Sequence, residues 1–243
     1  MKEIQITLTS SLVALLLVGS ANAQLNTSIG NGDFSINGGG FWNPVVSGWL
    51  EHEVYSAGAG IWGPQVIPGV SGSSLSLISG DASANTATVM QSLGTIGPSD
   101  VGQSFTLNAG AVAWDWYPTV KPFSGTVTLS FRTGCAPDSS FNYGSLLGTA
   151  GSVVTGVTVA GDGAQNGIGD DGGLQPLIAA FTPTAGDVGT QVFAVINLGN
   201  GVWGSGGENR FVVDNVTLAV TTIPEPSVLA LLGLGLLGLW RRR

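Results

Sequence analysis

Positive charge is scarce in this 243-residue chain, and its scarcity excludes a class of partner. Residues 24–226 contain three basic side chains, Lys121, Arg132 and Arg210, against fourteen carboxylates, which gives them a net charge of −11. So few cations cannot neutralise a phosphate backbone, so nucleic-acid binding is excluded. The same acidity favours solubility outside the cell and supplies the oxygen ligands that Ca²⁺ prefers.

Nucleophiles and bases are equally few. Cys135 is the only cysteine, so an intrachain disulfide is excluded; the residue is either a buried small apolar side chain or an exposed thiol able to dimerise. His52 is the only histidine and lacks the spacing of a zinc protease. We therefore predict no enzymatic activity. The alternative that stays open is a glycosidase pair drawn from Glu51, Glu53 and Glu208, because that chemistry needs only two carboxylates at a suitable separation.

The N-terminus carries an export signal. Lys2 provides a positive start, residues 12–18 are apolar, and Ala21-Asn22-Ala23 has the small-x-small pattern of a cleavage site before Gln24. This pattern is typical of a secretory signal peptide and predicts one over residues 1–23.

The C-terminus combines a Pro-Glu-Pro turn, an uncharged apolar segment over residues 227–240 and a cluster of arginines. Proline disfavours helix at the residue before it, so we expect a helix to begin at Ser227. That helix would be about 21 Å long at ~1.5 Å per residue, against ~30 Å for a bilayer core, which makes it a marginal membrane anchor. The arginines are expected on the cytoplasmic side.

This tripartite end resembles the PEP-CTERM sorting signal of Gram-negative bacteria. The resemblance implies export by the Sec machinery, transient anchoring in the inner membrane, recognition by an exosortase, cleavage near the Pro-Glu-Pro motif, and release to the cell envelope or outside, usually in bacteria that make exopolysaccharide. We expect a signal peptide over 1–23, one domain over 24–222 and a sorting segment over 223–243. The residues that carry the sorting motif are Pro224, Glu225, Pro226, Arg241, Arg242 and Arg243.

Residues 24–222 have the pattern of an all-β domain. Thr126 to Phe131 alternates hydroxyl and apolar side chains, and Gly- or Pro-containing joints separate runs of similar character. Many short strands with such joints predict an antiparallel β-sandwich, specifically a jelly roll. The predicted strands are 74–79, 87–93, 104–108, 111–117, 125–132, 153–160, 191–198 and 211–220, with a long loop over 161–173.

A second resemblance covers most of this domain. The stretches Asn31–Phe34, Ser47–Trp49, Gly72–Leu77, Gln91–Leu93 and Phe211–Leu218 are similar, in order, to the strands of galactose-binding-like and carbohydrate-binding jelly rolls. The resemblance implies that the first and last strands lie close together and hold a structural Ca²⁺ through Asp33 and Asp214. The alternative is that the side chains of Asp214 and Asn215 hydrogen-bond nearby backbone amides. No other cofactor is indicated.

Three tryptophans beside glycine-rich sequence, Trp42, Trp62 and Trp203, are the candidates for stacking on sugar rings. Together these features predict a sorted surface or extracellular-matrix protein with a non-catalytic, structural or adhesive β-sandwich that contacts exopolysaccharide. The alternative is a secreted carbohydrate-binding module or a carbohydrate-active enzyme.

Overall fold

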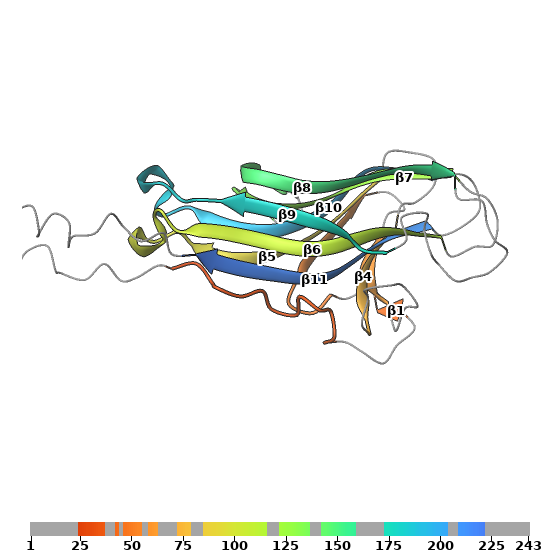
Figure 1. The fold of residues 1–243 in the computed structure, drawn as a ribbon, viewed down its shortest axis with the longest axis horizontal. Coiled ribbons are helices and arrows are strands. Elements are labelled where there is room, and N and C mark those ends of the chain that lie inside the picture. The colour runs from red at the N-terminus through yellow and green to blue at the C-terminus, as the bar shows by residue number, and fades with distance from the viewer. Residues whose placement is uncertain are drawn as a thin grey trace, which may run out of the picture.

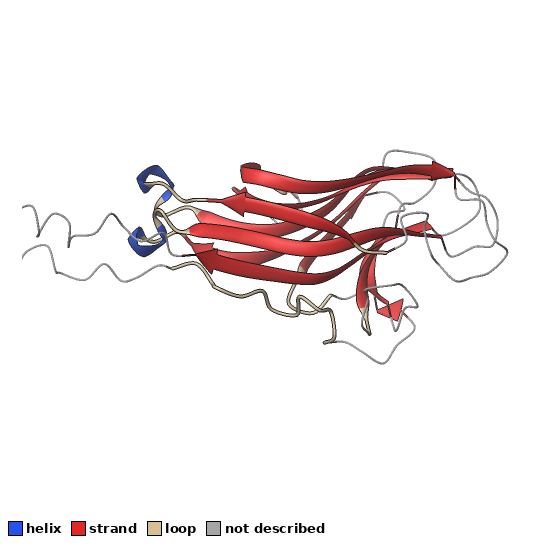
Figure 2. Cartoon of the chain, viewed as in Figure 1, coloured by secondary structure: helices blue, strands red, loops and turns tan. Residues whose placement is uncertain are grey.

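Alternating apolar side chains along long strands produce two facing antiparallel sheets, shown in Figures 1 and 2. The structure is a computed structural model, and it describes residues 24–36, 42–43, 46–54, 58–62, 72–78, 85–115, 122–136, 142–158, 173–203 and 209–221. The predicted signal peptide, the sorting segment and residues 161–172 of the predicted loop lie outside these ranges. The predicted antiparallel β-sandwich is confirmed.

The described residues form eleven strands and two short 3-10 turns. The strands form one continuous sheet in the order β1-β3-β4-β11-β6-β9-β8-β7-β10-β5-β2, which folds between β9 and β8 into two facing layers. We call the layer from β1 to β9 sheet A and the layer from β8 to β2 sheet B. Every pairing is antiparallel, and most neighbours in space are distant in sequence, as in a jelly roll. The elements are β1 (Trp42–Asn43), β2 (Leu50–Val54), β3 (Gly58–Trp62), β4 (Ser74–Ile78), β5 (Asn85–Thr95), η2 (Pro98–Asp100), β6 (Ser104–Asp115), β7 (Pro122–Thr133), β8 (Ser145–Thr158), β9 (Gln175–Phe181), η3 (Ala185–Asp187), β10 (Gln191–Trp203) and β11 (Asn209–Thr221).

The core lies between the two sheets and follows the period-two pattern of the strands. In β7, Val127, Leu129 and Phe131 are buried in it, whereas Thr126 and Thr128 on the opposite face are partly exposed. Strands β10, β5, β6 and β11 contribute further buried apolar side chains to the same cluster. Each large side chain buried in this way stabilises the fold by about 1.5–3 kcal/mol.

The two sheets meet along one side at β8 and β9. The backbones pair there at Thr149 and Ala180, and the Thr149 hydroxyl donates to the Ala180 carbonyl at 3.3 Å. A Cβ at Gly148 would lie 2.2 Å from the Ala180 oxygen, and a Cβ at Gly151 would lie 2.3 Å from the Ile178 nitrogen. Glycine at these two positions therefore allows the two sheets to approach closely.

Several predicted strand limits were wrong. The predicted runs 104–108 and 111–117 belong to one strand, β6, and β8 begins at Ser145 instead of Val153. Strands β1, β2, β3 and β9 were not predicted. The stretch Asn31–Phe34 is a turn and not an opening strand, because Asn31 and Phe34 both have a φ of +50°, which extended backbone does not allow.

Candidate functional site

Residues 24–36, the N-terminal strap, close the side of the sandwich opposite the β8–β9 side. Figure 1 shows this segment running alongside β11. The Asn26 amide donates to the Leu93 carbonyl of β5 at 2.7 Å, and the Val216 amide of β11 donates to the Gly32 carbonyl at 2.8 Å. The strap therefore joins sheet B to sheet A through backbone hydrogen bonds.

Two polar side chains hold the strap in place. Asp100, which is 1% exposed, accepts through Oδ2 from the amides of Leu25 at 3.0 Å and Gly97 at 2.8 Å. The amide group of Gln91 accepts from the Gly30 nitrogen at 2.8 Å and donates to the carbonyls of Gly30 at 2.9 Å and Gly48 at 2.8 Å. The side chains of Asp100 and Gln91 thus hydrogen-bond backbone groups and hold the strap against the sandwich.

The two stretches that opened the second resemblance meet in space. The side-chain amide of Asn31 donates to the Ser47 carbonyl at 2.9 Å, and the Trp49 indole donates to the Asn31 carbonyl at 3.4 Å. The rings of Phe34 and Trp49 lie 5.9 Å apart between centroids, and both side chains belong to the core. These conspicuous residues are therefore part of the folded core.

The two aspartates implied as calcium ligands lie on neighbouring segments but differ in environment. Asp33 is exposed, and its Oδ1 accepts from the Ser35 amide at 3.3 Å and the Ser35 hydroxyl at 2.9 Å; these bonds hold the pKa of Asp33 below its usual value. Asp214 is buried, and its Oδ1 accepts from the Asn215 amide at 2.7 Å.

In both aspartates, Oδ1 accepts a hydrogen bond from a nearby backbone amide. This is the role that was expected from the sequence as the alternative to calcium binding. Among the described residues, no group of three or more His, Cys, Asp or Glu side chains is placed to hold a metal ion. Ca²⁺ takes six to eight oxygens, so it would need ligands beyond Asp33 and Asp214. Calcium binding stays a prediction, and a melting temperature that EDTA leaves unchanged would exclude it.

The outer face of sheet B carries a row of polar side chains across its strands. Backbone register aligns Ser152 of β8, Thr128 of β7, Asn197 of β10 and Thr88 of β5, and the backbone of His52 in β2 continues the row. The Asn197 side-chain amide donates to the Thr88 hydroxyl at 2.7 Å. In this polar row (Ser152, Thr128, Asn197, Thr88), Ser152 is exposed and Thr128 and Asn197 are partly exposed, whereas Thr88 is buried (1% exposed) and serves to orient Asn197. The accessible hydroxyl and amide groups are of the kind that hydrogen-bond sugars.

The β7–β8 turn, of which residues 134–136 and 142–144 are described, folds over one end of this face. Cys135 packs against a small apolar cluster of Met90, Phe193 and Val195, which is separate from the main core. The Cys135 thiol donates to the Tyr143 carbonyl at 3.3 Å. Cys135 is partly buried, and this burial raises the pKa of its thiol, although the charge of Arg132 opposes the effect.

Arg132 connects the turn to the sheet. Its Nε donates to the Ser130 hydroxyl at 3.1 Å, and its Nη1 donates to the Gly144 carbonyl at 3.2 Å. The guanidinium lies over the ring of Tyr143, 5.0 Å from the centroid, in cation–π geometry. Sequence reasoning missed this arrangement and the polar row, although the isolated polar residues Thr88 and Asn197 inside apolar runs were a visible signal.

The predicted tryptophans divide between the sheets. Backbone register places Trp42 opposite Trp62 in the β1–β3 pair of sheet A, whereas Trp203 ends β10 in sheet B, opposite Phe123. The structure brings the first two backbones together and places the third apart. The side chains of all three lie outside the described part of the structure, so their stacking on sugars stays a prediction.

The structure does not test whether Glu51, Glu53 and Glu208 form a catalytic pair. Glu51 accepts a hydrogen bond from the Val46 amide through Oε1, so part of its capacity orders the segment before β2. The side chain of Glu53 and the whole of Glu208 lie outside the described residues. Their separation is therefore not defined.

Comparison with known proteins identifies the C-terminal signal. Residues 222–243 match the PEP-CTERM protein-sorting motif, as their sequence predicted. This motif indicates an exported protein that is processed by an exosortase. Within the ranges that the structure describes, no helix is long and apolar enough to cross a membrane, and the predicted helix over 227–240 lies outside them.

Among solved structures, this chain is similar to β-sandwich domains of diverse function. A Stig cyclase, Fisc, from Fischerella sp. TAU matches at 13% identity and a TM-score of 0.49, covering 83% of this chain and 98% of that one. The CBM22-1 xylan-binding domain of Paenibacillus barcinonensis Xyn10C matches at 11% identity and a TM-score of 0.37, covering 84% and 99%. Tailspike protein 4 of bacteriophage CBA120 matches at 12% identity and a TM-score of 0.45; the match covers 81% of this chain and 22% of that one. No curated protein matches the sequence.

Proposed function

We propose that this exported protein is a non-catalytic surface or extracellular-matrix component whose β-sandwich contacts exopolysaccharide through the outer face of sheet B. The observation that carries the proposal is the polar row on that face. The side-chain amide of Asn197 donates to the Thr88 hydroxyl at 2.7 Å, so Asn197 is held in position before any ligand arrives. Ordered groups lose less conformational entropy on binding, which favours recognition by a surface of this kind.

The surroundings of the row support the same role. Tyr143, 40% exposed, presents an aromatic surface at one end of the face, where sugar C–H groups can stack. Trp203 ends the strand that carries Asn197, and Trp42 and Trp62 lie in the other sheet. Stacking on these tryptophans is part of the proposal, with Trp62 and Trp203 as the residues to test.

The test is binding of the full chain to an array of bacterial polysaccharides. Asn197→Ala should weaken binding about tenfold, the size expected for loss of one well-placed interface side chain. Asn108→Ala is the matched control, because Asn108 is also partly exposed but lies on β6 in sheet A. Trp62→Ala and Trp203→Ala test the stacking positions. Equal effects of Asn197→Ala and Asn108→Ala would contradict a site on sheet B.

The same preparation tests the enzymatic alternative. Release of reducing sugar from a bound polysaccharide, lost on Glu51→Gln or Glu208→Gln, would replace the proposal with a carbohydrate-active enzyme. Intact-mass measurement of the protein recovered from its native cells tests the processing route: a C-terminus near Pro226 is expected, and a protein ending at Arg243 would contradict cleavage.

A further inference from the structure

Arg132 is an unusual cation in this chain because the surrounding sequence is so acidic. Residues 24–226 hold three basic side chains and fourteen carboxylates, so an arginine has many available partners. Yet among the described residues no carboxylate forms an ion pair with Arg132, whose contacts are to Ser130, Gly144 and Tyr143. Within the described ranges, this partly buried guanidinium therefore has no carboxylate partner.

The guanidinium is also fixed in position. One hydrogen bond at Nε and one at Nη1 use two of its five N–H donors. The ring of Tyr143 covers one of its faces. The donors that remain, on Nη1 and Nη2, keep the planar arrangement that suits two-point binding of a carboxylate. The side chain of Arg132 is therefore already ordered in the free protein, and it would lose little conformational entropy when a ligand binds.

Arg132 lies beside two exposed side chains and on the face that carries the polar row. Leu146 is its register partner on β8 and is 48% exposed, and Tyr143 is 40% exposed. Thr128 lies four residues back along β7, about 13 Å away at ~3.3 Å per residue, on the same face as Arg132. An anionic group at Arg132 would therefore lie on the same face as the polar row, displaced from it along β7.

We propose that Arg132 binds the carboxylate of a uronic acid unit, so that the ligand of the outer face of sheet B is an acidic polysaccharide. This inference rests on the proposed function and names the class of its glycan. The overall charge of the protein makes the inference sharply testable. A net charge of −8 opposes overall attraction to a polyanion, and the comparison of Arg132→Gln with Arg210→Gln separates recognition by Arg132 from attraction by the C-terminal arginines.

The experiment uses the full chain in non-ionic detergent and measures its affinity for polygalacturonate, methyl-esterified polygalacturonate and neutral dextran. We expect polygalacturonate to bind and the methyl ester to bind at least about tenfold more weakly, because esterification removes the charge that Arg132 recognises. Dextran sulfate is the fourth probe; affinity equal to that of polygalacturonate would identify anion binding without preference for carboxylate and would overturn the assignment of a uronic acid.

Arg132→Gln should lower affinity for polygalacturonate about tenfold and should not lower affinity for the ester. Arg210→Gln is the charge-matched control, since it removes one positive charge from β11 in sheet A, and it should change affinity less than about twofold. Because the ester changes only the ligand, the comparison holds even where Arg132→Gln loosens the turn. Equal binding of acid and ester, or equal loss in both variants, would overturn the inference.

The two proposals fail separately. A neutral glycan whose binding is weakened by Asn197→Ala and not by Arg132→Gln would overturn the acidic ligand and leave the proposed function in place. If no polysaccharide binds, both are overturned.

Discussion

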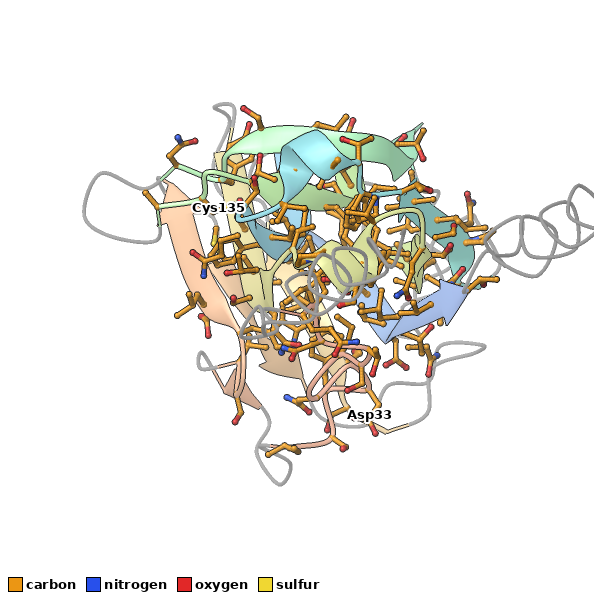
Figure 3. All side chains as sticks on the ribbon, turned by 90° about the vertical axis from the view of Figure 1, so that its left-hand side faces the viewer. Asp33 and Cys135 are labelled. Atoms are coloured by element: carbon orange, nitrogen blue, oxygen red, sulfur yellow. The ribbon has the colours of Figure 1, made fainter. Side chains whose placement is uncertain are left out.

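The N-terminal strap and the β7–β8 turn lie on different sides of the sandwich and use polar side chains in different ways. Figure 3 shows Asp33 of the strap and Cys135 of the turn far apart in the cross-section of the domain. In the strap, Gln91 and Asp100 direct their oxygens and nitrogens to backbone groups of the protein itself. Beside the turn, Arg132 of β7 is held by two hydrogen bonds, and no described residue accepts from its other N–H donors.

This difference suggests separate roles: the strap stabilises the fold, and the turn is the region where we propose that a ligand binds. The strap contains the residues that attract attention in the sequence, Asn31, Phe34 and nearby Trp49, and the structure uses all three for packing and closure. The turn has no recognisable motif, yet it lies over the face that carries the polar row. Substitutions in the strap should therefore change stability, and substitutions near the turn should change binding and reactivity.

The largest effect is expected at Phe34, whose side chain is fully buried under the strap. Phe34→Ala should lower the free energy of unfolding by about 3–5 kcal/mol, through lost burial and the cavity left behind. Ile36→Ala, two residues along and 58% exposed, is the control and should change it by less than about 0.5 kcal/mol. Urea unfolding followed by tryptophan fluorescence measures both. Similar losses would show that the strap is not docked as described.

Asp100 should have the next largest effect. Asp100→Ala leaves the buried amides of Leu25 and Gly97 without an acceptor, at about 1–3 kcal/mol for each, so the free energy of unfolding should fall by about 2–6 kcal/mol. Asp187 is the matched control: it caps η3 in the same way, accepting from the Thr184 amide at 2.7 Å, but in an exposed position.

Asp187→Ala should cost only about 0.5–1 kcal/mol, since water can satisfy the exposed amide. The comparison of the two variants by urea unfolding isolates the effect of burial. If Asp100→Ala costs no more than Asp187→Ala, the strap does not depend on its buried carboxylate.

The fold was predictable where a strand alternates strictly. Thr126 to Phe131 predicts both the buried and the exposed face of β7, and the structure confirms it. Strand β9 was missed because Pro176 and two alanines weaken its pattern, although Leu177, Ala179 and Phe181 alternate correctly into the core.

The candidate site was less predictable because its parts are distant in sequence. Asn197 meets Thr88 across 109 positions, a pairing that only the order of strands in sheet B creates. Arg132 meets Tyr143 and Gly144 because the chain reverses between β7 and β8. Local patterns report which residues face outward; they do not report which outward residues become neighbours.

The reactivity of the Cys135 thiol measures how accessible the β7–β8 turn is to solvent. Burial raises the pKa of its thiol, so at pH 8 the reactive thiolate should be rarer than in the unfolded chain, and alkylation by iodoacetamide should be slower. As pH rises through the elevated pKa the rate should increase, because more thiolate forms. Mass spectrometry of samples quenched over time, with the protein in 8 M urea as the control, measures the rates. Equal rates in the two states would mean that Cys135 is not covered.

The smallest effect is expected at Asp33, on the exposed surface of the strap. Hydrogen bonds from the Ser35 amide first, and then from the Ser35 hydroxyl, hold the pKa of Asp33 below its usual value. A lowered pKa in the folded state contributes stability at pH values above the ordinary pKa of the group, and this contribution is lost as pH falls through the folded pKa.

Solvent screening keeps this contribution to stability small, so the direct measurement is an NMR titration of the Asp33 carboxyl carbon. Ser35→Ala should move that pKa only part of the way back, because the backbone hydrogen bond persists. A complete return would show that the hydroxyl alone fixes the turn, and an unchanged pKa would show that the strap is ordered here by its backbone.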